Sequence, residues 1–172
     1  MRLRSDVNNN LTTYLNDHLA GSVAAIELID DLIGASKDQS LKTFLADLKR
    51  DIEDDQKVLQ QLIAGADEKQ SATRKAAAWF SEKLARAKLK IAGEDFGGLG
   101  LVQALEMLAL GIRGKELLWR ALRESGFAAP SDVGPPEPRR RRIDLAKLEQ
   151  RALQQQQRVE EKRLEAARAA FR

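Results

Sequence analysis

Apolar residues recur at three- and four-residue spacing along four stretches of the chain, as expected of amphipathic helices. The four predicted helices begin near residues 8–10, 38–40, 67–71 and 99, and end near 33, 64, 92 and 124. Asn, Asp or Ser stands where the first three of these helices would be capped, and glycine follows each helix end. Matched lengths and short links predict an antiparallel, up-down-up-down four-helix bundle over residues 1–126.

The composition changes abruptly after the fourth predicted helix. Residues 127–142 hold all four prolines of the chain, which predicts a helix-breaking linker. Residues 143–172 then read as one long helix that Asp144 would cap. Its apolar face is thin, and an isolated helix of this kind is marginal in water. We therefore expect it to pack on the bundle or on a second subunit.

The overall composition fits an all-α protein of the cytoplasm. Of 172 residues, 43% are hydrophobic and only 5% aromatic, and helix-forming residues dominate. The absence of cysteine excludes disulfides, thiolate catalysis and cysteine-based metal sites. No apolar run is long enough to span a membrane, and the opening MRLRSDVNNN has no apolar segment typical of a secretory signal.

The net charge of +3 belongs to the C-terminal region. Residues 137–172 carry 11 Lys and Arg against 6 Asp and Glu, whereas the remainder carries 18 against 20. The patch formed by Arg139, Arg140, Arg141 and Arg142 could bind nucleic acid or an acidic membrane surface through charge alone. A solvated linker is the simpler interpretation, because a basic groove with stacking aromatics is missing. We expect no membrane partner and no nucleic-acid partner.

Ionisable residues interrupt the apolar stripes of three predicted helices. His18 lies in the stripe of the first helix, Asp55 in that of the second with Asp51 one turn earlier, and Lys115 in that of the fourth. Buried charges are costly unless they meet a partner, so the sequence predicts a buried polar cluster in which Asp55 accepts from Lys115 or His18. Such mutual neutralisation would leave no vacancy for chemistry. The alternative is that each is a boundary residue whose polar tip reaches solvent.

A four-helix bundle with inward carboxylates and a histidine resembles the ferritin-like superfamily, in outline, over roughly residues 8–125. That resemblance implies a carboxylate site for Fe or Mn, for storage or redox work, from candidates His18, Asp51, Asp55, Glu82 and Glu106. The Glu-x-x-His motif of that superfamily is missing, and Lys115 would place a positive charge where the metal would sit. We therefore expect an internal ion pair in place of the metal, and no cofactor.

Three further segments, YLNDHLAG, RKAAAWFSEKLARAKL and GIRGKELLWRAL, resemble an uncharacterised family of small bacterial helical-bundle proteins. This second resemblance also covers the bundle, and it implies the fold without implying an activity. It brings no catalytic or ligand-binding residue that could be carried over to this chain.

Two glycines and a serine complete the candidate chemistry. Gly111 and Gly114 stand inside the fourth helix, where they indicate close approach of another helix, a local bulge, or room for a ligand beside Lys115. The segment GGLG lacks the preceding strand and the Lys-Ser/Thr ending of a phosphate loop, and so reads as a turn. Ser22 lies one turn from His18, but nothing in the sequence supplies an oxyanion site.

The sequence therefore predicts a non-enzymatic helical bundle that acts through self-association or a protein partner, using its C-terminal helix. A ferritin-like metal-binding protein is the main alternative, and a basic-tailed nucleic-acid adaptor is a weaker one.

Overall fold

The computed structural model describes residues 2–66, 98–127 and 143–172. These residues form four helices and no strand, which confirms the predicted all-α class: α1 (Arg2–Ala35), α2 (Gln39–Ala66), α4 (Leu99–Glu124) and α5 (Leu145–Ala170). The helix predicted over 67–92 lies outside the described residues, and so does the predicted linker except for Phe127.

Local sequence explains most of the helix ends. The Asp38 carboxylate caps α2 by accepting from the backbone N–H groups of Ser40 and Leu41, at 2.8 and 3.3 Å. Asp144 caps α5 in the same way, accepting from the backbone N–H of Lys147 at 2.9 Å. Beyond the end of α4, Gly126 takes a φ of 66°, a left-handed conformation that glycine adopts without steric cost.

The start of α1 differs from the prediction. The helix begins at Arg2 and continues through the three asparagines of residues 8–10, where capping was expected. Asparagine prefers a cap but does not force one, and residues 2–4, two arginines and a leucine, are good helix formers. The sequence therefore underestimated α1 by about two turns.

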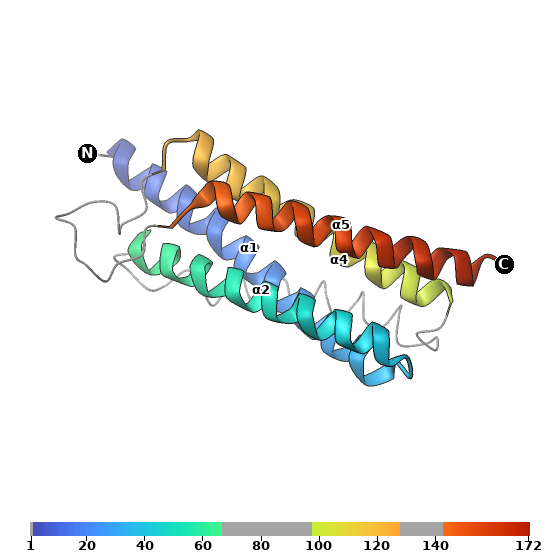
Figure 1. Cartoon of the computed structure of the whole chain (residues 1–172). Helices are drawn as coiled ribbons and strands as arrows, with labels where there is room; N and C mark the ends of the chain where they lie inside the picture. The colour runs from blue at the N-terminus through green and yellow to red at the C-terminus, as the bar shows by residue number, and fades with distance from the viewer. Residues whose placement is uncertain (1, 67–97, 128–142) are drawn as a thin grey trace, which may run out of the picture.

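The described helices associate as two side-by-side pairs (Figure 1). The turn at Ser36–Asp38 joins α1 to α2, which returns alongside it in the opposite direction. α4 and α5 likewise run in opposite directions, and they share the most extensive contact between any two described helices. The two pairs meet along α1 and α4, and side chains of α2 reach both α4 and α5.

The buried apolar residues form two separate clusters, one toward each end of the bundle. The first is Leu28, Ile29, Leu32, Leu45, Leu48, Ile52, Val102, Ala104, Leu105, Leu108, Ile112, Val159 and Ala166. The second is Leu15, Leu59, Leu62, Ile63, Leu118, Trp119, Leu122, Leu148 and Ala152. Asp55 of α2, Lys115 of α4 and Gln155 of α5 each lie, along their own helix, between the residues of the first cluster and those of the second. We call these three hydrogen-bonded residues the polar layer. A polar layer thus divides the apolar core.

The stripes predicted for the second and fourth helices face the interior, but that of the first is displaced. Leu15 and Ile29 share the predicted stripe with His18 at helical spacing, and both are buried. His18 is only partly buried, whereas Leu28 and Leu32 outside that stripe are buried. The inward face of α1 is thus rotated away from His18. Among the described helices none is long and apolar enough to cross a membrane.

Candidate functional site

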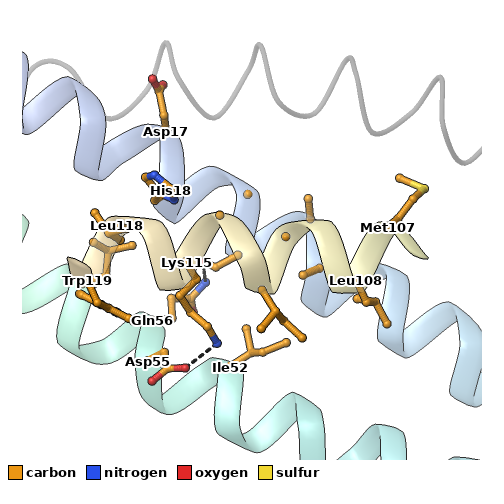
Figure 2. A pocket seen from close by; sticks show the side chains of 18 of the residues that line it. Asp17, His18, Ile52, Asp55, Gln56, Met107, Leu108, Lys115, Leu118 and Trp119 are labelled. Atoms are coloured by element: carbon orange, nitrogen blue, oxygen red, sulfur yellow. Dashed lines mark hydrogen bonds and ion pairs between the residues drawn. The ribbon is translucent and has the colours of Figure 1, made fainter. Parts of the chain in front are cut away.

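The centre of the polar layer is an ion pair between α2 and α4. The ammonium Nζ of Lys115 donates to the Oδ2 of Asp55 at 2.6 Å, and both side chains are largely buried (13% and 3% exposed; Figure 2). The two residues occupy the apolar stripes of their helices, which is why the sequence pattern could place them inward. In the absence of a partner, either charge would be strongly destabilising there.

α5 supplies two further partners to this pair. The Gln155 amide accepts from Lys115 through its oxygen and donates to Asp55 Oδ2 at 3.2 Å through its nitrogen, while the Arg151 guanidinium donates to Asp55 Oδ1. Neither residue was predicted from the sequence. Gln155 was recognisable, because it falls at helical spacing within the stripe Leu148, Ala152, Gln155, Val159. Arg151 carries no such signal, since only the position of α5 brings it to Asp55.

Asp51 lies beside the polar layer rather than in it. Its carboxylate pairs with Arg158 of α5, and both side chains are about one-third to two-fifths exposed. The predicted cluster therefore holds Asp55 and Lys115 at its centre, with Asp51 at its edge. Arg158 thereby bridges α5 to α2.

Burial weakens the charged form of Lys115. Removal from water lowers the pKa of its ammonium from 10.5 to about 7, with the nearby Arg158 acting in the same direction and Asp51 opposing it. The amine therefore changes protonation state near neutral pH, unlike an ordinary surface lysine.

His18 is separate from the ion pair. Its ring packs edge-on against Tyr14, with centroids 4.7 Å apart and planes at 86°. Burial lowers the pKa of His18 below its usual 6.5, against the opposing charge of Asp17, so the imidazole is neutral at pH 7. In Figure 2, His18 and Asp17 lie across the α4 ribbon from the Lys115–Asp55 pair. The predicted alternative in which His18 donates to Asp55 is wrong.

A pocket of about 480 Å³ connects these two groups. Tyr14 and His18 line it on α1, Asp55 lines it on α2, and Lys115 and Trp119 line it on α4. Much of the remaining wall is formed by small or aliphatic residues: Gly21, Ala24, Ala25, Leu28, Ile52, Leu59, Met107, Leu108, Gly111, Ile112, Gly114 and Leu118. The expectation that mutual neutralisation leaves no vacancy is therefore wrong beside Lys115.

The two mid-helix glycines of α4 both face this pocket. A Cβ atom at Gly111 would meet nothing within 4 Å, and one at Gly114 would stand 3.9 Å from the Cε1 atom of His18. A Cβ atom would thus meet no steric clash at either position, so neither glycine is needed to let another helix approach α4 closely. Of the alternatives left open by the sequence, room beside Lys115 fits Gly111 best.

A second charged group fastens α4 to α5. Glu116 is fully buried (0% exposed) beneath the guanidinium groups of Arg113 and Arg120 on its own helix. Glu149 of α5 pairs with Arg120 at 2.9 Å and with Arg123 at 3.1 Å. The stripe pattern did not indicate Glu116, because apolar periodicity does not register the two arginines of the same helix that pair with it.

The candidate metal ligands are dispersed and paired with cations. Glu106 pairs with Arg163 of α5 at 3.2 Å, in addition to the pairs of Asp51 and Asp55 described above. Within residues 2–66, 98–127 and 143–172, no three His, Asp or Glu side chains are grouped so as to hold a metal ion. Glu82 and the basic patch of Arg139, Arg140, Arg141 and Arg142 lie outside the described residues.

Comparison of the chain with family models, curated proteins and solved structures finds no match. The resemblances to the ferritin-like superfamily and to a bacterial helical-bundle family stay predictions.

Proposed function

We propose that this protein is a non-enzymatic helical bundle that self-associates by exchanging α5 between two copies of the chain. The observation that carries the proposal is the position of α5, whose side chains complete the core and the polar layer of the other helices. The same surface can receive α5 from its own chain or from a second copy, because the contacts are identical in the two arrangements.

The contacts of α5 are specific as well as apolar. Leu148, Ala152 and Val159 pack into the two core clusters, while Arg151 and Gln155 bind Asp55 of α2. A helix held by such contacts is stable only when docked, which favours exchange over release into solvent. Residues 128–142, which connect α4 to α5, number 15 and include all four prolines. Their length gives the chain a way to direct α5 to either receptor surface.

We propose no enzymatic activity because Asp55 and Lys115 of the polar layer pair with each other. Among the described residues, no nucleophile–base pair with a third orienting group adjoins them. The proposal includes the architecture expected from sequence: an antiparallel bundle, ferritin-like in outline, with α5 following a proline-rich linker. We also propose that the protein lies in the cytoplasm, because the chain has no cysteine and so needs no oxidising compartment to form disulfides.

Charge reversal across the α2–α5 contact tests exchange directly. One full-length chain carries Asp51→Arg and a second carries Arg158→Asp, so that each alone places like charges where Asp51 and Arg158 now pair. In an exchanged dimer of the two chains, both contacts join opposite charges. We expect sedimentation velocity to show a mixed dimer in the equimolar mixture, at concentrations where neither chain alone dimerises.

The matched control carries both reversals in one chain, which restores an opposite pair in cis. Adding that chain to the wild type creates no charge preference for mixed dimers. If the equimolar mixture of single variants sediments as the sum of its components up to millimolar concentration, α5 does not exchange and the proposal is wrong.

A further inference from the structure

We propose that the pocket lined by α1, α2 and α4 is a binding site for an uncharged, largely hydrocarbon molecule. The lining residues that the structure describes all belong to these three helices, so the inference does not depend on exchange of α5 between chains. Three observations carry it. They are the apolar wall, the internal pairing of the polar side chains in that wall, and the side-chain volume missing from α4.

The wall is apolar and leaves enough space for a small molecule. The volume of about 480 Å³ falls within the range of roughly 300–1,000 Å³ that is usual for small-molecule sites. Leu28, Ile52, Leu108 and Ile112 supply aliphatic side chains from three helices. Empty space of this kind forfeits dispersion contacts, and apolar cavities take up apolar guests. A hydrocarbon body that enters the pocket leaves water and restores those contacts, so both effects favour its binding.

The polar side chains of the wall bind protein partners. Lys115 and Asp55 form the 2.6 Å ion pair of the polar layer (Figure 2). Gln56 donates to the Oγ atom of Ser22 at 3.0 Å, and the Ser22 hydroxyl donates to the backbone carbonyl of Leu19 at 2.7 Å. A polar ligand that displaced water here would lose its hydration without gaining equivalent hydrogen bonds from these groups. The pairing therefore favours a ligand without strong polar groups.

The charged residues of the wall oppose an anion and give a cation little in return. Asp17 and Asp55 contribute two carboxylates, against the single ammonium of Lys115 that Asp55 already pairs. His18 adds no charge at pH 7, because burial lowers its pKa below the usual 6.5. Asp17 is exposed to solvent, so water and salt screen its attraction for a cation. An uncharged ligand avoids the desolvation cost that either ion would incur.

The third observation is the side-chain volume missing from α4. Gly111 and Gly114 both line the pocket, although glycine destabilises a helix interior relative to alanine. A Cβ atom at Gly111 would meet nothing within 4 Å, and one at Gly114 would stand 3.9 Å from Cε1 of His18. Helix packing therefore accounts for neither glycine. Space for a bound molecule accounts for both, because side chains at these positions would occupy the pocket.

A matched pair of fluorescent probes tests the inference on the full-length protein at pH 7. N-Phenyl-1-naphthylamine is uncharged, and 8-anilino-1-naphthalenesulfonate is the same ring system with a sulfonate group. Both dyes fluoresce strongly when they leave water, and protein is titrated into a fixed, low concentration of each. We expect saturable binding of the uncharged dye with a dissociation constant of roughly 1–100 µM, and at least about tenfold weaker binding of the sulfonate.

Two variants with the same new side chain locate the binding. Gly111→Phe places a ring where a Cβ atom meets nothing within 4 Å, so it should fill the pocket and weaken binding of the uncharged dye at least about tenfold. Ala121→Phe is the matched control, because Ala121 is exposed on the same helix and is not among the residues that line the pocket. It should bind the dye as the wild type does. Circular dichroism establishes that both variants are folded.

The outcomes separate cleanly. Failure of the uncharged dye to bind the wild type overturns the proposal, and so does equal or tighter binding of the sulfonate. Equal binding by the Gly111→Phe and Ala121→Phe variants would place the dye elsewhere and is equally adverse.

A different occupant would also be recognised. If the dye binds the Phe80→Ala variant but not the wild type, the predicted helix of residues 67–92 fills the pocket and the proposal is wrong. Should Gly111→Phe fail to fold, the two dyes on the wild type still decide the question. None of these results depends on the sedimentation of charge-reversed chains.

Discussion

The Nζ atom of Lys115 on α4 lies 2.6 Å from the Oδ2 atom of Asp55 on α2, between the two apolar clusters of the core. Such a pair adds little net stability compared with well-packed apolar residues, because both ions lose their hydration. It does fix how the helices align along their length. A shift of one helix by a turn would separate the two charges and leave each of them buried and unpaired.

Replacement of Asp55 by asparagine should therefore be severe. Asp55→Asn leaves Lys115 and Arg151 without their counter-ion, and we expect a loss of about 3–5 kcal/mol in the free energy of unfolding. Chemical denaturation measures this loss. Asp54→Asn is the matched control, since Asp54 is exposed and pairs with Lys57, an exposed residue of its own helix. It should cost less than about 1 kcal/mol. Similar losses in the two variants would contradict a buried role for Asp55.

The lowered pKa of Lys115 makes stability depend on pH. The unfolded chain binds a proton at this lysine up to about 10.5, whereas the folded protein releases it near 7. Between these values the unfolded state holds more protons, so stability should rise with pH, by on the order of 1 kcal/mol per unit. Denaturation from pH 7 to 9 measures the slope, and the Lys115→Met variant should lack it. A wild-type slope that survives in the variant would assign the effect to another group.

His18 offers a direct spectroscopic test, because it is the single histidine of the chain. We expect its ring-proton resonances to titrate with a midpoint below 6.5, since burial outweighs the attraction of Asp17. As the pH falls below 6.5, His18 is protonated in the unfolded chain before it is protonated in the folded protein. The free energy of unfolding therefore decreases as the pH falls through this range. A midpoint at or above 6.5 would show that Asp17 controls the imidazole.

What the sequence could predict depended on the kind of signal each residue carried. Asp55 and Lys115 interrupt clear apolar stripes, and a stripe fixes the inward face of a helix without knowledge of its neighbours. Gln155 interrupts a stripe too, but that stripe is thin, and the sequence analysis did not single this residue out. Arg151 and Glu116 lie off the stripes. Arg151 meets Asp55 only because α5 packs beside α2, and Glu116 pairs with two arginines of its own helix, which apolar periodicity does not register.

The pocket illustrates a second limit of sequence patterns. Periodicity predicts which residues of a helix turn inward, but not how closely the inward faces of two helices approach each other. The ion pair of Lys115 was therefore expected to leave no space beside it. The glycines of α4 were the relevant signal, because they remove side-chain volume beside that lysine. The periodicity also failed to predict the rotation of α1, because it placed His18 within the inward stripe, whereas His18 is only partly buried and lines the pocket.

Gly111 within α4 and Gly126 just beyond its end should respond in opposite directions to the same substitution. Gly111→Ala should stabilise the protein by up to about 1 kcal/mol, because alanine favours the helix and its Cβ meets nothing within 4 Å. Gly126→Ala also meets nothing, but the φ of 66° at this position should cost about 1–2 kcal/mol. Thermal denaturation of both variants measures the contrast. Equal shifts would mean that backbone conformation does not separate the two sites.

The metal-binding alternative makes a contrary prediction that elemental analysis can decide. Asp51, Asp55 and Glu106 each face a protein cation in the structure, and a metal would have to displace those cations while adding its own charge. After loading with Fe²⁺ or Mn²⁺ and removal of the unbound ion, we therefore expect far less than one metal per chain. A stoichiometric metal that is lost in Asp55→Asn and retained in Asp54→Asn would show that the ion pair yields to a metal, and would restore the ferritin-like reading of this bundle.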